Sequence, residues 1–91
     1  MRFDGKTAII TGAGGGLGKA YAKALCQEGA RVIIAEYNDQ LGKAAEKELK
    51  DQGGSVVFIH TDVSKEEDIK NTVQKTIEMF GKIDILINNA Q

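Results

Sequence analysis

A cluster of glycines near the start of this 91-residue chain is its feature best suited to binding chemistry. Residues 11–18 read Thr-Gly-Ala-Gly-Gly-Gly-Leu-Gly and lie between an apolar run and a helical pattern. Glycine lets a backbone turn sharply and approach a ligand closely. A helix that begins there presents free N–H groups and about half a positive charge. The segment therefore predicts a turn that cradles a phosphate.

The glycine spacing is G-x-x-x-G-x-G, at Gly12, Gly16 and Gly18, and differs from the strict dinucleotide fingerprint G-x-G-x-x-G. The three physical roles are retained: a tight turn after the strand, close approach to a pyrophosphate, and close packing of the next helix. A P-loop is excluded because no Gly-Lys-Ser/Thr follows the glycines. Cofactor contacts are expected along the whole turn, at Gly12, Gly14, Gly15, Gly16, Leu17 and Gly18.

A carboxylate follows this turn at a suitable distance. Glu36 ends an apolar run 18 residues after Gly18, close to the ~20 residues expected for an acid that hydrogen-bonds a ribose 2′-hydroxyl. A carboxylate there repels a 2′-phosphate, and neither Gly15 nor Tyr37 supplies a cation to receive one. The pattern favours NAD over NADP. An ordinary carboxylate at a strand end remains the alternative.

Asp62 and Val63 come one residue after a third apolar run, at the edge where open α/β sheets bind ligands. Asp62 is suited to accept a hydrogen bond from an adenine amino group, while Val63 covers the ring. Asp62 is also suited to cap the next helix, although Ser64 with Glu67 forms the better capping box. His60 is the sole histidine, so we expect neither a histidine metal cluster nor a Ser-His-Asp arrangement.

The elements that must position these residues alternate between strand-length apolar runs and helix-length amphipathic segments. Strands are expected at 7–11, 31–36, 55–60 and 83–88, and helices at 17–28, at 39–51 and from the Ser64 cap to about residue 80. Asn38 is expected to cap the second helix. The inner helix faces are expected to consist of Leu17, Ala20, Tyr21, Ala24 and Leu25, then Leu41, Ala44, Ala45 and Leu49, then Ile69, Val73, Ile77 and Phe80.

The order β-α-β-α-β-α-β with short loops predicts parallel strands joined by right-handed crossovers. The fold class is α/β: a Rossmann-like half, three-layered, with a four-stranded parallel sheet in the order 3-2-1-4. The length of the chain allows one small domain, residues 1–91, which we expect to be a truncated dinucleotide-binding domain.

Composition bears on partners and location. The 12 basic and 13 acidic residues are interspersed and create no field for nucleic acid or anionic lipid. No apolar run approaches the ~18 residues of a membrane span, and no segment has a signal-peptide layout. Because the single cysteine, Cys26, excludes an intramolecular disulfide, a cytoplasmic location is expected.

Three motifs together resemble the short-chain dehydrogenase/reductase family of NAD(P)-dependent oxidoreductases: Thr11-Gly12-x-x-x-Gly16-x-Gly18, Asp62-Val63 and Asn88-Asn89-Ala90. The resemblance implies a Rossmann fold with the glycine turn on the pyrophosphate, Glu36 on the adenosine ribose and Asp62 at the adenine. It also implies that Asn89 and Ala90 line the cofactor groove. The family continues that last motif with glycine, where this chain has Gln91.

The family's catalytic serine and Tyr-x-x-x-Lys pair have no counterpart in these residues, since Tyr21 is followed four residues later by Leu25, and Tyr37 by Leu41. The expectation is an N-terminal, NAD-binding portion of an oxidoreductase, inactive alone. It should bind NAD weakly, on the order of 0.1–1 mM. The alternative is a non-catalytic, flavodoxin-like module that self-associates or binds a nucleotide.

The expected strand order also leaves strand 83–88 as an apolar edge, beside a sheet face covered by one helix alone. Such an edge invites pairing with another chain. A homodimer through this strand and the adjacent face is therefore expected.

Overall fold

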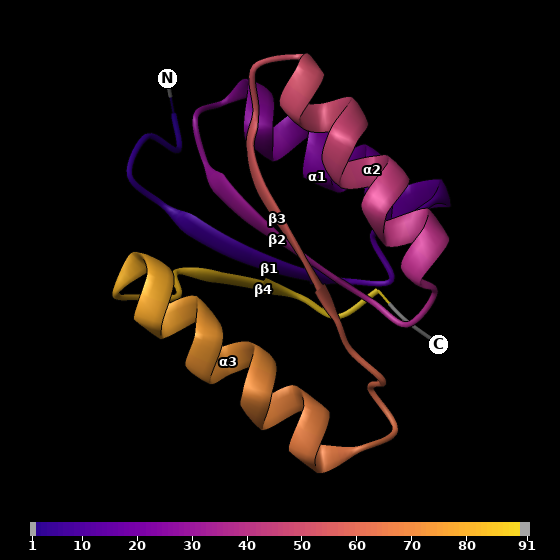
Figure 1. Cartoon of the computed structure of the whole chain (residues 1–91). Coiled ribbons are helices and arrows are strands. Elements are labelled where there is room, and N and C mark those ends of the chain that lie inside the picture. The colour runs from indigo at the N-terminus through magenta and orange to yellow at the C-terminus, as the bar shows by residue number, and fades with distance from the viewer. Residues whose placement is uncertain (1, 90–91) are drawn as a thin grey trace.

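Strands and helices alternate along the chain in the computed structural model, which describes residues 2–89 (Figure 1). The strands are β1 (Thr7–Thr11), β2 (Arg31–Glu36), β3 (Ser55–His60) and β4 (Ile85–Ile87), and the helices are α1 (Gly16–Gln27), α2 (Asp39–Asp51) and α3 (Glu66–Phe80). All strand pairs are parallel, and the sheet order is β3-β2-β1-β4. The predicted fold class and strand order are confirmed.

The sheet separates two apolar layers. Helices α1 and α2 lie on one face and α3 lies on the other (Figure 1). Ile10, Val32 and Ile34 pack on the first face, against α1 and α2, and Ile9 and Ile33 belong to the second layer. Both faces of β2 are thus buried, which explains its continuous apolar sequence.

The helix boundaries follow local signals. The Asn38 side chain accepts a hydrogen bond from the Leu41 N–H at 3.0 Å and caps α2, as predicted. Gly29 follows α1 with φ +92°, and Gly81 ends α3 with φ +79°. Both positions require the left-handed backbone that glycine adopts without strain.

The predicted inner faces of the helices are confirmed in part: Ala45 and Leu49 are buried, and Leu25 and Phe80 pack against the core, whereas the other predicted residues are exposed. In α1 the buried residues are Gly18 and Ala22, and in α2 they are Gly42, Ala45 and Leu49. The small residues Gly18, Ala22, Gly42 and Ala45 let both helices approach the sheet closely, and Leu49 is the one large buried side chain among these residues. The exposed residues of those stripes are Leu17, Ala20, Tyr21 and Ala24 in α1, and Leu41 and Ala44 in α2.

Helix α3 also packs through a different face than predicted. Thr72 and Thr76 are buried, whereas Ile69, Val73 and Ile77 are 41–44% exposed. The Thr72 hydroxyl lies 2.7 Å from the Thr61 hydroxyl just after β3, and the Thr76 hydroxyl donates to the Thr72 carbonyl. Hydroxyl pairing therefore joins α3 to the sheet and leaves its apolar stripe outside.

Strand β4 is shorter than the predicted 83–88. Asp84 precedes it but already pairs with β1: its N–H donates to the Thr7 carbonyl, and its carboxylate accepts the Thr7 N–H, both at 2.9 Å. Leu86, in the middle of β4, is 67% exposed. The sheet therefore has an apolar edge at this position.

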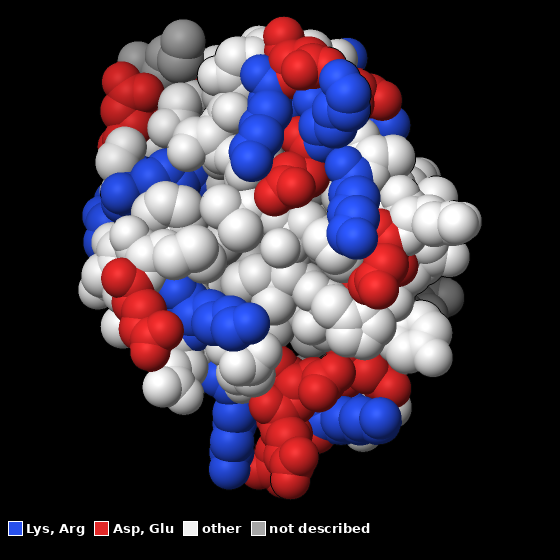
Figure 2. Space-filling model, viewed as in Figure 1, with Lys and Arg blue, Asp and Glu red and all other residues white. Residues whose placement is uncertain are grey.

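Charges of both signs alternate over the face shown in Figure 2, around α2 above and α3 below. Ion pairs such as Lys47–Asp51 and Lys19–Glu48 contribute to this pattern. Within residues 2–89, none of the helices has the length and apolarity needed to cross a membrane.

Candidate functional site

The carboxyl ends of the four parallel strands lie at the same edge of the sheet, where a groove of about 880 Å³ opens. The glycine turn follows β1, and further segments follow the other three strands. The groove is lined by these predicted residues: Gly12, Gly15, Gly16, Leu17, Glu36, Asp62, Val63 and Asn89. Sequence segments separated by up to 77 residues therefore meet at one site.

The glycine turn has a backbone that specifically needs glycine at two positions. Gly12 has φ +65° and Gly16 has φ +56°, conformations that other residues adopt only with strain. Gly15 has an extended backbone and open space around it. The turn thus presents bare backbone to the groove.

Two further glycines of the cluster pack against protein instead of lining the groove. A methyl group at Gly18 would lie 2.5 Å from the Gly12 carbonyl oxygen and 2.6 Å from Asn89 Nδ2. A methyl group at Gly14 would lie 2.8 Å from both Glu36 Oε1 and Leu41 Cβ. Gly14 and Gly18 therefore shape the turn. The remaining predicted residue, Ala90, lies outside the described residues.

The start of α1 differs from the starts of the other helices. Its cap residue, Gly15, offers no side-chain hydrogen bond, and its first turn contains no acidic residue. By contrast, α2 has the Asn38 cap and Asp39, and the first turn of α3 is acidic. The positive end of α1 is therefore left uncompensated beside the groove.

Asn89 connects the end of β4 to the glycine turn. Its backbone N–H donates to the Thr11 hydroxyl at 2.9 Å, and its side chain donates to the Gly12 carbonyl at 3.3 Å. Thr11 Oγ1 also lies 3.1 Å from Asn88 Oδ1. The two asparagines thus join β1 to β4 at the floor of the site.

Glu36 reaches across from the end of β2. Oε1 accepts the Gly14 N–H and Oε2 accepts the Asn38 N–H, each at 3.0 Å. The Glu36 side chain thus lines the groove and, through these two bonds, holds the backbone of the glycine turn and of the segment before α2.

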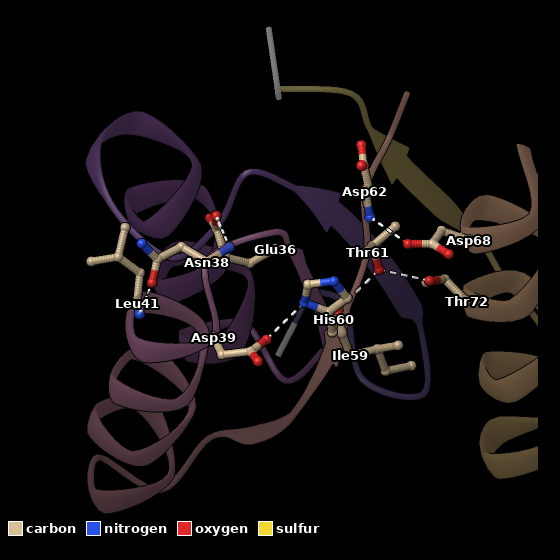
Figure 3. Close-up of polar contacts among 10 residues, drawn as sticks. All are labelled: Glu36, Asn38, Asp39, Leu41, Ile59, His60, Thr61, Asp62, Asp68 and Thr72. Carbon is tan, nitrogen blue, oxygen red and sulfur yellow. Dashed lines mark hydrogen bonds and ion pairs between the residues drawn. The ribbon is translucent and has the colours of Figure 1, made fainter. Parts of the chain in front are cut away.

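Asp62 organises the loop after β3. Its Oδ1 accepts the Ser64 hydroxyl at 2.6 Å and the Ser64 N–H at 3.0 Å, and these bonds hold the pKa of Asp62 below its usual value. The Asp62 N–H in turn donates to the Asp68 carboxylate, as Figure 3 shows. The predicted capping box at Ser64 is wrong, because Lys65 is the cap residue and provides no side-chain bond.

Sequence reasoning missed an aromatic group beside this site. Tyr37 lines the groove, and its ring centroid lies 5.5 Å from that of His60. His60 Nδ1 lies 2.7 Å from Asp39 Oδ1 at the start of α2 (Figure 3). The position of Tyr37 directly after Glu36, at a strand end, was the available signal. Ala35, Thr61 and Ser64 are the remaining lining residues that were not predicted.

Comparison with known proteins agrees with this arrangement. Residues 6–91 match the family described as short chain dehydrogenase. Over 88 residues the chain is 42% identical to an uncharacterized oxidoreductase of Thermotoga maritima, covering 97% of this chain and 34% of the relative. It is 45% identical to tropinone reductase-like 1 of Erythroxylum coca, covering 98% and 32% respectively.

Solved structures extend the likeness to three dimensions. A hydroxysteroid dehydrogenase from Escherichia coli superposes with a TM-score of 0.96 at 37% identity, over 99% of this chain and 38% of that one. A short chain dehydrogenase/reductase from Burkholderia phymatum, solved in complex with NAD, gives 0.90 at 32% identity, over 94% and 31%. The chain thus spans about a third of the length of these relatives. It belongs to the short-chain dehydrogenase family.

Proposed function

We propose that this chain forms the dinucleotide-binding portion of an NAD-dependent oxidoreductase. The observation that carries the proposal is the uncapped start of α1, which opens onto a groove floored by glycine backbone. A pyrophosphate placed there would receive backbone N–H bonds and the favourable field of the helix. The NAD complex of the Burkholderia phymatum relative supports the same class of ligand.

The proposed contacts follow the predicted residues. Glu36 binds the adenosine ribose, and Asp62 with Val63 holds the adenine at the end of β3. Because Oδ1 of Asp62 is engaged with Ser64, the adenine amino group would be received by Oδ2. Asn89, followed by Ala90, forms the wall toward β4. Gly14 and Gly18 contribute by shaping the turn.

Preference for NAD over NADP rests on the Glu36 carboxylate, which faces the place of a ribose 2′-substituent. A 2′-phosphate there would meet a negative charge, and Gly15 and Tyr37 offer no cation. An affinity for NADP equal to that for NAD would overturn this preference.

A substitution at Gly15 tests the pyrophosphate position. Gly15 has open space and an extended backbone, so Gly15→Asp should fold and even improve the helix cap. Its carboxylate would nevertheless repel a bound pyrophosphate. In a fluorescence titration with NADH we expect at least tenfold weaker binding for Gly15→Asp than for its neutral match, Gly15→Asn. Equal affinities of the two variants would contradict the proposed site.

The 91 residues on their own should not reduce carbonyl substrates. Their tyrosines, Tyr21 and Tyr37, lack the lysine four positions later that the family uses in catalysis. Stoichiometric turnover of NADH by the purified chain would refute this.

Self-association through β4 and the neighbouring sheet face is the last part of the proposal. Leu86 is 67% exposed in β4, and Ile69, Val73 and Ile77 form an exposed stripe on α3. Burial of this surface against a second copy would remove apolar area from water. Ile85 neighbours Leu86 on the same β4 edge and points to the opposite face of the sheet, so Ile85→Lys tests pairing along the edge itself: it should dissociate the assembly, and an unchanged oligomer mass would point to another interface.

A further inference from the structure

The carboxylate of Glu36 connects two backbone segments that are far apart in sequence. Oε1 accepts the N–H of Gly14 in the glycine turn, and Oε2 accepts the N–H of Asn38 just before α2. Figure 3 shows Glu36 beside Asn38, whose own side chain caps the helix at Leu41. One side chain therefore connects the turn after β1 to the start of α2.

The packing at Gly14 reinforces this connection. A methyl group there would lie 2.8 Å from Glu36 Oε1 and 2.8 Å from Leu41 Cβ, so the backbone is pressed against the β2–α2 corner. Gly15, one residue later, has nothing within 4 Å of the same position and lines the groove. The turn thus has one residue that is held by the protein and a neighbour that is presented to a ligand.

We infer that Glu36 is a positioning residue as well as a ribose-binding residue: it holds the glycine turn in its binding shape before any dinucleotide arrives. The inference rests on the proposed function for its second half, the ribose. A carboxylate offers about four acceptor positions. The two backbone N–H groups occupy one position on each oxygen, and the others stay available for ribose hydroxyls.

The same geometry determines which substitutions Glu36 tolerates. Glutamine has the same length but a single acceptor oxygen, so it can satisfy the N–H of Gly14 or of Asn38 and must turn an NH₂ group toward the other. A neutral residue at position 36 therefore removes the repulsion against a 2′-phosphate and loosens the turn at once. Glu36→Gln should consequently lose affinity for NAD without gaining comparable affinity for NADP.

Amide hydrogen exchange of the ligand-free protein tests the positioning role directly. In Glu36→Gln the amide of Gly14 or of Asn38 should exchange about tenfold faster or more than in the wild type, because a charge-assisted hydrogen bond is lost. The amides of Ile9 and Ile33 in the central strands should keep their protection. The matched control is Glu67→Gln, which removes an exposed carboxylate from the first turn of α3. Unchanged exchange at both Gly14 and Asn38 in Glu36→Gln would overturn the inference.

Glu36→Asp serves if Glu36→Gln does not fold. Its carboxylate keeps the charge but sits on a side chain one methylene shorter, so it should not reach both N–H groups, and the amide of Gly14 or of Asn38 should exchange faster than in the wild type. Unchanged exchange at both amides would overturn the inference. Both measurements are made without cofactor, so their failure is distinct from failure of the chain to bind NAD.

Discussion

The five glycines of residues 12–18 perform different tasks. Gly12 and Gly16 adopt positive φ angles, Gly15 leaves open space at the groove, and Gly14 and Gly18 permit close packing. The spacing of the motif predicted that glycines were needed, and the structure distinguishes the reason at each position. Stability and binding should therefore respond differently at different glycines.

Gly18→Ala should destabilise the fold. The added methyl would collide with the Gly12 carbonyl and the Asn89 side chain, which ties β4 to the turn. We expect a loss of roughly 1–3 kcal/mol in the free energy of unfolding, measured by urea denaturation. Gly15→Ser, at an open position with extended backbone, should leave that free energy nearly unchanged. If Gly18→Ala were as stable as Gly15→Ser, the start of α1 would have to pack less tightly against Gly12 and Asn89 than these distances indicate.

Asp84 should make the free energy of unfolding depend on pH. Its carboxylate accepts the Thr7 N–H, and this bond chiefly, helped by Lys82, holds the pKa of Asp84 below its usual value. A carboxyl with a lowered pKa stabilises the fold above its unfolded value near ~3.9, and that contribution is lost as pH falls through the lower folded value. Asp84→Asn should thus melt at a lower temperature than the wild type at pH 7. The difference in melting temperature should shrink as pH falls below ~3.9 and through the lower folded pKa, and a difference that stays constant with pH would contradict this prediction.

At the scale of elements, the three helix starts differ in a way that supports the proposed pyrophosphate position at α1. Helix α2 is closed by Asn38, and α3 has Glu66, Glu67 and Asp68 in its first turn, but α1 has neither device. The N-terminus of α2 has a side-chain cap and that of α3 has compensating negative charge, whereas the N-terminus at the groove has neither. The α2 cap should therefore matter to stability only.

Asn38→Ala should lower the unfolding free energy by about 1 kcal/mol, because the Leu41 N–H loses its acceptor. For a chain of this size that corresponds to roughly 4–8 °C in Tm. Asn38→Asp keeps an acceptor oxygen and should retain most of the wild-type Tm in a melting curve followed by circular dichroism. If the alanine and aspartate variants lost the same amount of stability, the loss would not come from the missing acceptor, and the proposed role of the cap would be contradicted.

The elements and their order could be predicted from the sequence because period and connectivity determine them. The apolar runs at 31–36 and 55–60 lack helical periodicity, and strands that are connected by crossover helices must be parallel. The helix faces could not be predicted, since two stripes compete in α3: Thr72 with Thr76, and Ile69 with Val73 and Ile77. Periodicity finds both stripes and does not decide which one meets the sheet. In the structure the threonine stripe meets the sheet, where the Thr61 and Thr72 hydroxyls share one hydrogen bond.

The site was partly predictable for a similar reason. The distance between Gly18 and Glu36 placed both residues at the same sheet edge, because carboxyl ends of parallel strands gather there. Spacing gives no side-chain direction, however, so the bond from Glu36 to Gly14 remained invisible. The bond from Ser64 to Asp62, which replaced the expected helix cap, was invisible for the same reason.

For the molecule as a whole, the apolar surface beside β4 is the main feature beyond the groove. Leu86 is 67% exposed, on the face of the sheet that α3 covers in part. We expect Leu86→Lys to shift the weight-average mass toward the monomer in sedimentation runs at high micromolar concentration. Tyr21→Lys, on the exposed side of α1 across the sheet, is the control and should leave the mass unchanged. A Leu86→Lys variant with wild-type mass would exclude this surface as the interface.

Isothermal titration calorimetry with NAD and NADP tests the central claim most directly, which is that the glycine turn and Glu36 form an adenosine-diphosphate site. The proposed contacts all belong to that half of the ligand, so we expect saturable binding of NAD at about 0.1–1 mM, or roughly −4 to −5.5 kcal/mol. NADP should bind measurably more weakly. Absence of heat from NAD with a chain shown to be folded, or tighter binding of NADP, would contradict the account.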